Sequence, residues 1–201
     1  MTVAALRHLE RLPAGDPVGA LVFFHGYFGI PEDFLPFLDK IDPDRRFHGY
    51  LPEGPRPVSE GRTSWFDRDA GESPEQQLAP IWGWLDALPF SAARTVLGGW
   101  SQGAMVAYAL ALARHRPRPA GVVALGALLP PEPPPDLERP FPPIAIGHGT
   151  ADDAVDVEHA RGARDLLRGA GADVLYLETG IGHRIDQEIV PTLRDFLAKL
   201  P

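Results

Sequence analysis

Cysteine is absent from the 201 residues, which excludes disulfide bonds, thiolate nucleophiles and cysteine-ligated zinc. Basic residues are too few to balance the acidic ones, and the formal net charge is -8. A protein whose main partner is nucleic acid or an anionic membrane is expected to carry a basic stripe, and the sequence shows none. We therefore expect neither nucleic-acid binding nor stable membrane association.

Long apolar runs are lacking as well. Residues 1–13 carry Arg, His and Glu among their leucines, so they are predicted to be neither a signal peptide nor a membrane span, and a cytoplasmic location is expected. The hydrophobic content of 44% is ordinary for a soluble globular protein. Because a chain of this length can bury one core but hardly two, residues 1–201 are predicted to form a single domain.

What the sequence does contain is an alternation of strand and helix patterns. Apolar, β-rich runs predict strands at residues 18–24, 46–51 (weaker), 96–98, 120–129, 144–147 and 173–177. Helical spacing predicts helices at residues 31–38, 74–89, 104–112, 155–169 and 186–200, and Ser73 is a good N-cap for the second of these. This alternation predicts an α/β fold with a mostly parallel, doubly wound sheet and helices on both faces.

The most informative segment is residues 95–112, which reads as strand, sharp turn and helix around Gly99-Trp-Ser101-Gln-Gly103. A G-x-S-x-G sequence in this setting is typical of a nucleophile elbow, in which the glycines allow the backbone to bend and the serine hydroxyl stands exposed above the sheet edge. The start of the following helix favours negative charge beside that serine. Ser101 is therefore the candidate nucleophile.

Two further loops follow predicted strands and supply the groups that a serine nucleophile needs. The first carries Asp152 and Asp153, and the second carries His183, so the chain order is Ser, Asp, His. Serine is a poor nucleophile unless an imidazole takes its proton and a carboxylate orients that imidazole. Of the seven histidines, only His183 follows the acid on a loop after the last strand. Spacing alone does not separate the two aspartates.

Two loops admit more than one interpretation. Residues 54–71 are polar and rich in Pro and Gly, yet contain Trp65 and Phe66, which either anchor the loop on the core or wall a substrate pocket. Residues 130–143 hold a dense cluster of prolines. Proline-rich recognition ligands look similar, but a stiffened connecting loop is favoured because the segment lies between two strands of one domain.

Several sequence blocks together resemble the phospholipase/carboxylesterase family of α/β-hydrolases, which includes bacterial carboxylesterases and acyl-protein thioesterases. The blocks are His25-Gly26 with Gly29, Pro52 with Trp65-Phe-Asp67, Gly98 to Gly103, His148-Gly-Thr-Ala-Asp152, and Gly182-His183. They run from about Leu21 to the last helix. The resemblance implies a compact α/β-hydrolase fold, Asp152 as the triad acid, and an oxyanion hole formed by the backbone N–H groups of Tyr27 and Gln102.

The chain also departs from that family pattern. Tyr27 replaces a small aliphatic residue, Ala104 replaces a second glycine, and Arg184 follows the histidine where an acidic residue is common. These differences concern the shape of the substrate more than the triad. Candidates for an acyl pocket are Phe28, Trp65, Phe66 and Ile181, with Leu128 and Leu129 more easily explained by core packing.

The predicted function is a cofactor-independent serine carboxylesterase that acts on short- to medium-chain esters through Ser101, His183 and Asp152. No insertion long enough for a lid domain is visible, which fits small-molecule esters better than a lipid interface. An acyl-thioesterase or lysophospholipase with the same triad is the alternative within enzymes, and a non-catalytic binding protein is the alternative outside them. A metal hydrolase that binds its ion through His148 and Asp152 is the least favoured alternative, because it would give the serine in the sharp turn no role. A homodimer remains an open alternative.

Overall fold

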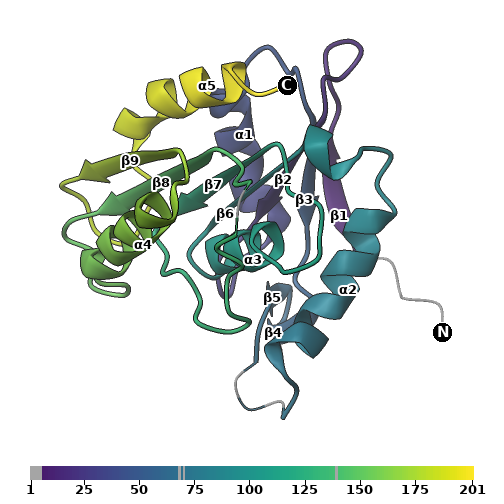
Figure 1. Ribbon diagram of the computed structural model, residues 1–201. Coiled ribbons are helices and arrows are strands. Elements are labelled where there is room, and N and C mark those ends of the chain that lie inside the picture. The colour runs from purple at the N-terminus through teal and green to yellow at the C-terminus, as the bar shows by residue number, and fades with distance from the viewer. Residues whose placement is uncertain (1–5, 68, 70, 139) are drawn as a thin grey trace.

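The computed structural model describes residues 6–67, 69, 71–138 and 140–201 of the chain. A seven-stranded sheet in the order β1-β3-β2-β6-β7-β8-β9 forms its centre (Figure 1). Only β1 runs antiparallel to its neighbour; the other pairs are parallel. The strands are β1 (His8–Arg11), β2 (Ala20–Phe24), β3 (His48–Pro52), β6 (Thr95–Trp100), β7 (Gly121–Leu125), β8 (Ile144–Gly149) and β9 (Val174–Thr179).

Helices cover both faces of this sheet, as expected for a doubly wound α/β fold. On one face lie α2 (Pro74–Asp86), α3 (Gln102–Ala111) and α4 (Val157–Ala170), and on the other lie α1 (Leu35–Ile41) and α5 (Val190–Ala198) (Figure 1). Short 3-10 turns accompany them: η1 (Pro31–Phe34), η2 (Ala92–Arg94) and η3 (Gln187–Ile189). The predicted fold class is thus confirmed.

The two faces have separate hydrophobic cores because successive side chains of a strand point to opposite sides. In β2, Val22 and Phe24 belong to the core under α2, α3 and α4, whereas Leu21 and Phe23 belong to the core under α1 and α5. All five residues of β2 are buried. A strand buried on both faces therefore needs a continuous apolar run, which is what residues 20–24 provide.

Most predicted elements are present, with shifted ends. The strand expected at residues 120–129 stops at Leu125, because Gly126 adopts a positive φ of 59° and turns the chain toward the site. The strand expected at residues 144–147 continues to Gly149, since it pairs with β9 over its whole length. Helix α2 begins as predicted, with Ser73 in a reciprocal capping box with Gln76, and ends at Asp86.

Two features were not predicted. Strand β1 is an edge strand of four residues whose pattern alternates too briefly to stand out. The segment predicted as a plain loop at residues 54–71 contains the antiparallel hairpin of β4 (Arg56–Ser59) and β5 (Arg62–Ser64), although two of its residues lie outside the described part of the chain. Its exposed, polar strand β4 lacks the apolar alternation that would identify a strand.

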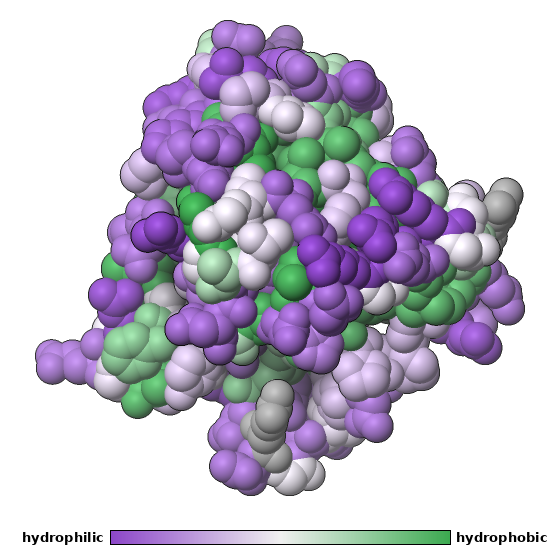
Figure 2. Space-filling model, turned by 90° about the vertical axis from the view of Figure 1, so that its left-hand side faces the viewer, coloured by the Kyte–Doolittle hydropathy of each residue, from purple (hydrophilic) through white to green (hydrophobic). Residues whose placement is uncertain are grey.

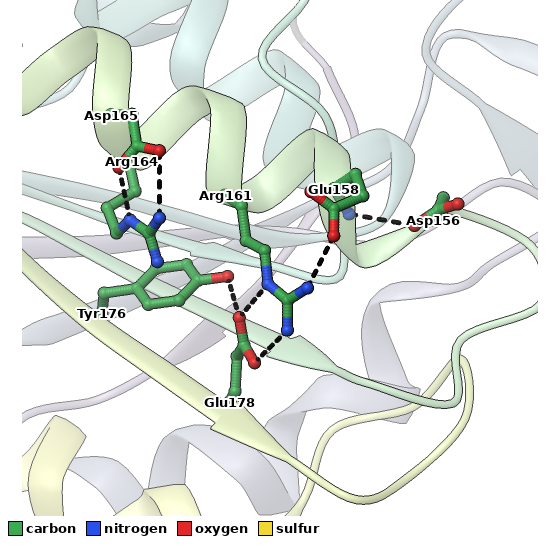
Figure 3. Close-up of polar contacts among 7 residues, drawn as sticks. All are labelled: Asp156, Glu158, Arg161, Arg164, Asp165, Tyr176 and Glu178. Atoms are coloured by element: carbon green, nitrogen blue, oxygen red, sulfur yellow. Dashed lines mark hydrogen bonds and ion pairs between the residues drawn. The ribbon is translucent and has the colours of Figure 1, made fainter.

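The last strand, β9, is an edge of the sheet and is flanked by charged side chains of α4 (Figure 3). Arg161 makes two contacts of 2.8 Å with the carboxylate of Glu178, and Tyr176 donates a hydrogen bond to the same carboxylate. The guanidinium of Arg164 lies 4.6 Å from the Tyr176 ring centroid. Charged groups beside an edge strand disfavour pairing with another chain.

Within the described residues, no helix combines the length and apolar character that crossing a bilayer requires. The first five residues, which belong to the segment predicted not to be a signal peptide, lie outside the described part of the chain.

Candidate active site

Ser101 lies in the sharp turn between β6 and α3 that the sequence predicted. Its backbone has φ 54° and ψ -124°, a conformation that a non-glycine residue adopts only when its surroundings enforce it. Its N–H donates to the carbonyl oxygen of Leu125 at 2.8 Å. The turn requires glycine at position 103, because a Cβ there would lie 2.1 Å from the carbonyl oxygen of Phe24 and would clash with it. The hydroxyl is thus held above the carboxyl edge of the sheet.

The loops after β8 and β9 come together beside this turn. Ala151 N–H donates to the carbonyl oxygen of Ile181 at 3.0 Å, and Thr150 N–H donates to Thr179 at 2.7 Å. Gly149 permits this approach, because a Cβ there would lie only 2.2 Å from the Ile181 oxygen. Backbone contacts therefore fix the loop that carries the acid against the loop that carries the histidine.

The three candidate catalytic side chains form one hydrogen-bonded chain. His183 Nδ1 lies 2.7 Å from Asp152 Oδ2, and His183 Nε2 lies 3.0 Å from Ser101 Oγ. Because a carboxylate only accepts, Nδ1 carries the proton and Nε2 is free to accept the serine proton. Asp153, the alternative that spacing left open, is exposed and outside this chain of contacts.

Asp152 is held as an anion at a fixed angle. Its side chain is 1% exposed, and its Oδ1 accepts hydrogen bonds from the N–H groups of Ala154 at 3.0 Å and Val155 at 2.8 Å. Burial alone would raise the pKa of Asp152, but the hydrogen bonds from His183 and from these two amides outweigh burial and lower the pKa. The carboxylate can therefore orient His183 and stabilise an imidazolium.

The other histidines do not compete for the role of base. His148 is fully buried, with Nε2 2.8 Å from the Val155 carbonyl oxygen and 3.3 Å from Asp152 Oδ2. His159 is exposed on α4, as the sequence predicted. Within the described residues, no group of three or more His, Cys, Asp or Glu side chains is arranged to hold a metal ion.

Tyr27 and Gln102, whose backbone N–H groups are predicted to form an oxyanion hole, lie in segments that border Ser101. Gln102 is the first residue of α3, so its amide has no acceptor within the helix. Tyr27 follows Gly26, whose position is so close to the serine that a Cβ there would lie 3.4 Å from Ser101 Cβ. Both amides thus belong to segments that border the nucleophile.

His25 fixes the peptide group that contains the Tyr27 amide. Its Nε2 accepts a hydrogen bond from Gly54 N–H at 3.0 Å, so its Nδ1 carries the proton and donates to the Gly26 carbonyl oxygen at 2.7 Å. Burial lowers the pKa of His25, which keeps the ring neutral. In a trans peptide the Tyr27 N–H points away from the Gly26 oxygen, so holding that oxygen also orients the N–H.

Comparison with known proteins shows the family of the chain. The family model described as phospholipase/carboxylesterase matches residues 74–201, which is more than half of the chain. The chain belongs to the phospholipase/carboxylesterase family. The resemblance seen in the sequence is confirmed, although the His25-Gly26 and Trp65-Phe-Asp67 blocks precede the matched residues. A search of curated protein sequences gave no match.

Solved structures share the fold over nearly the whole chain. Esterase PE8 is 24% identical, with a TM-score of 0.84 and coverage of 98% of this chain and 100% of that one. The Bacillus cereus carboxylesterase is 20% identical, with a TM-score of 0.80 and coverage of 98% and 95%. The Zea mays acyl-protein thioesterase 2 is 22% identical, with a TM-score of 0.78 and coverage of 96% and 97%. Family and fold together support an esterase-type α/β-hydrolase.

The side chain of Gln102 has a position that sequence reasoning missed. Its Oε1 accepts from Trp65 N–H at 2.9 Å and its Nε2 donates to the Phe66 carbonyl oxygen at 3.3 Å. It therefore attaches the loop after β5 to the elbow of this family member. The only signal for this contact in the sequence was a side-chain amide directly after the candidate nucleophile, to which no role had been assigned.

Of the predicted pocket residues, Trp65 requires a correction. Its side chain has no exposed surface, stacks edge-on against Phe24 with centroids 5.1 Å apart, and donates from Nε1 to the His25 carbonyl oxygen at 2.7 Å. Trp65 therefore anchors its loop on the core, the other interpretation left open by the sequence, because a large aromatic with a satisfied N–H is stable when buried.

The remaining pocket candidates are dispersed. Phe66 is partly buried and faces a groove beside Gln102. Phe28 is 45% exposed and lies under the guanidinium of Arg62, 5.7 Å from the ring centroid. Ile181 is half-buried and contributes its backbone to the contact between the two loops. A role in substrate binding stays a prediction for all three.

Two grooves flank the serine on the carboxyl side of the sheet, the face that Figure 2 presents. The imidazole-side groove has a volume of about 310 Å³ and is lined by Phe34, Phe37, Lys40, Trp100, His183 and Arg184, among others. The amide-side groove has a volume of about 460 Å³ and is lined by Phe66, Gln102, Met105, Pro130, Pro131 and Glu132, among others. Both grooves are open to solvent.

Proposed function

We propose that the protein is a serine carboxylesterase that hydrolyses short- to medium-chain esters through an acyl-enzyme. The observation that carries the proposal is the continuous hydrogen-bonded chain from Asp152 through His183 to Ser101, with contacts of 2.7 and 3.0 Å. These distances lie within the range at which proton transfer between nucleophile and base takes place. Membership in the phospholipase/carboxylesterase family supports the same chemistry.

The first half-reaction transfers the acyl group to the enzyme. Ser101 Oγ attacks the ester carbonyl carbon while its proton moves to His183 Nε2, and the carbonyl oxygen becomes an oxyanion. The N–H groups of Tyr27 and Gln102 would stabilise that oxyanion, each typically contributing about 3 kcal/mol. When the intermediate collapses, the C–O bond breaks and the alcohol leaves with the proton held on His183.

The second half-reaction returns the enzyme to its starting state. His183 removes a proton from water, whose oxygen attacks the acyl carbon of the Ser101 ester. The new oxyanion occupies the same donors, and its collapse releases the carboxylic acid and returns the proton to Ser101 Oγ. Asp152 stays ionised throughout and holds the imidazolium, which is consistent with its lowered pKa.

The amide-side groove is the better candidate for the acyl chain. It begins at Gln102, beside the proposed oxyanion donor, and Phe66 and Met105 give it an apolar wall. The proline-rich loop closes one side of it and is held in place by Arg118, whose guanidinium donates to the carbonyl oxygens of Ala111 and Asp136. The open groove lets solvent reach the bound acyl chain, which favours short chains because a long apolar chain would stay partly exposed.

The test is a series of p-nitrophenyl esters from acetate to palmitate, measured as kcat/KM. A maximum between acetate and octanoate supports the proposal. A maximum at palmitate, or faster hydrolysis of acyl thioesters or long-chain lysophospholipids than of any short-chain ester, would favour the alternative thioesterase or lysophospholipase activity. A wild-type protein that binds esters but hydrolyses none would be a binding protein instead.

A further inference from the structure

The lining of the imidazole-side groove indicates which alcohol the substrate ester carries, an inference that rests on the proposed function. In ester hydrolysis the leaving alcohol must take its proton from His183 Nε2, so its oxygen departs within hydrogen-bond reach of that atom. The ring of His183 forms part of the wall of the imidazole-side groove, together with Trp100. The alcohol portion of the ester is therefore expected to extend into this groove.

The charges that border this groove are mainly positive. Arg184 is exposed beside His183, and within the described residues its guanidinium has no ion-pair partner. Lys40, which also lines this groove, makes its contact with the neutral side-chain oxygen of Gln187 at 2.6 Å. The acidic residue of the lining, Asp33, lies 3.2 Å from Arg62 and is thereby compensated.

The amide-side groove has the opposite character. Its lining includes the carboxylates of Asp67 and Glu132, besides that of Glu72, which is paired with Arg56. The protein as a whole also carries a formal charge of -8, so a local excess of cations is not a consequence of overall composition. An ester bound across the serine therefore meets an acidic border on its acyl side and a basic border on its alcohol side.

The apolar part of the imidazole-side groove limits where an anion can sit. Phe34, Phe37 and Trp100 line its floor, while Arg184 and Lys40 are both exposed at its rim. A short carbon chain between the ester oxygen and the anionic group would pack on the aromatic floor. The anion would then reach the rim, where cations and solvent both stabilise it.

We propose that the preferred substrates are esters whose alcohol portion carries an anionic group, a carboxylate or a phosphate, and that Arg184 is the main residue that selects it, assisted by Lys40. Because both cations are exposed, each contributes a modest, salt-dependent preference rather than an absolute requirement. A preference of about 3- to 10-fold in kcat/KM over a neutral ester of the same size is expected.

The experiment compares butyrate esters that share the acyl group and differ in the alcohol. The alcohols are 1-propanol, choline, glycolate, 4-hydroxybutyrate and glycerol 3-phosphate, and the readout is the ratio of each kcat/KM to that of propyl butyrate. The wild type should favour the anionic alcohols and disfavour choline. The glycolate and 4-hydroxybutyrate esters place a carboxylate at two distances from the ester oxygen, so they report how far the cations lie from the ester. The glycerol 3-phosphate ester shows whether a phosphate is preferred to a carboxylate.

Variants assign the preference to residues. In Arg184→Gln the anionic-to-neutral ratio should fall toward one, in Arg184→Glu the cationic choline ester should become the better substrate, and Lys40→Gln should give a smaller decrease. Arg116→Gln is the matched control, because Arg116 lines a cavity with Thr95 at the opposite end of β6 and its variant should keep the wild-type ratio.

The outcomes separate this inference from the proposed function. Hydrolysis of all butyrate esters at equal rates, or an anionic-to-neutral ratio that Arg184→Glu leaves unchanged, would overturn the inference while the esterase proposal stands. No hydrolysis of any ester, including p-nitrophenyl butyrate, would overturn the proposed function itself. A wild-type preference that disappears in 0.5 M salt together with the effect of Arg184→Gln would support the electrostatic origin.

Discussion

The indole of Trp100 lies against the imidazole of His183, with ring centroids 4.8 Å apart and an interplanar angle of 34°. Trp100 is the residue directly before the nucleophile, and it also contacts Phe34, with ring centroids 6.1 Å apart. An aromatic face attracts a cation, and His183 becomes a cation each time it accepts the serine proton. The contact therefore supports the position of the base and places an aromatic surface beside the charge that forms on it during the reaction.

Replacing Trp100 should slow turnover more than it weakens binding. We expect Trp100→Leu to lower kcat by about 5- to 30-fold, which corresponds to a cation-π contribution of about 1–2 kcal/mol. Trp100→Phe should retain most of the activity because a ring face remains. A decrease confined to KM in Trp100→Leu, with kcat unchanged, would mean that the ring only lines the groove.

Gly149 should be intolerant of a side chain because it lies under the histidine loop. In Gly149→Ala the new Cβ would meet the carbonyl oxygens of Ile181 at 2.2 Å and Gly182 at 2.7 Å, so the loop that carries His183 must move. We expect at least a 100-fold lower kcat/KM, since small displacements of a base are costly.

Gly162 is the matched control for that substitution. It lies in the middle of α4 with no atom within 4 Å of a new Cβ. Gly162→Ala should raise the unfolding free energy by about 0.5–1 kcal/mol, because alanine is the better helix former, and should leave kcat/KM unchanged. Wild-type activity in Gly149→Ala would show that the two loops are not coupled as described.

His25 should make the folded protein sensitive to mild acid. Burial lowers the pKa of His25 in the folded state, so the unfolded chain binds a proton more readily below about pH 6.5. Stability from this residue is thus fully present above that pH and is lost as the pH falls through the lowered pKa. Urea unfolding at pH 7.5 and pH 5.0 should show a smaller loss of stability in His25→Gln than in the wild type.

The ion pair between Arg161 and Glu178 should contribute little at neutral pH and nothing in strong acid. Hydrogen bonds from Arg161 and Tyr176 lower the pKa of Glu178 to about 2, so its contribution is present above the unfolded value near 4.5 and disappears as the pH falls through about 2. Because the pair is exposed, Glu178→Gln should lower Tm by only about 1–3 °C. An equal Tm difference in 1 M salt would contradict an electrostatic origin.

The fold, and the position of Ser101, Asp152 and His183 at one edge of the sheet, could be predicted because local patterns mark the strands and the loops that follow them. Continuous apolar runs such as residues 20–24 identify strands buried on two faces, and Ser101 falls in a strand-turn-helix pattern that few other functions require. Which aspartate contacts His183 was different. Both Asp152 and Asp153 lie on the right loop, so spacing left the choice open; the family resemblance implied Asp152, and in the structure it is Asp152 whose Oδ2 lies 2.7 Å from His183 Nδ1.

The surroundings of the site could not be predicted in the same way, because they depend on contacts between distant segments. The His25 ring donates to the Gly26 carbonyl oxygen and accepts from Gly54 N–H, and the side chain of Gln102 hydrogen-bonds to the backbone of residues 65 and 66. None of these pairings leaves a periodic pattern in the sequence. Trp65 shows the same difficulty, since an aromatic residue in a polar loop fits a pocket wall and a buried anchor equally well until its burial is known.

The most direct test of the central claim is hydrolysis of p-nitrophenyl butyrate by the wild type and by Ser101→Ala, together with labelling by a fluorophosphonate and mass spectrometry of the labelled peptide. The account predicts turnover in the wild type, a loss of about 10⁴-fold or more in the variant with an unchanged fold, and a single label on Ser101. Equal activity in the two proteins, or a label on another residue, would contradict Ser101 as the nucleophile.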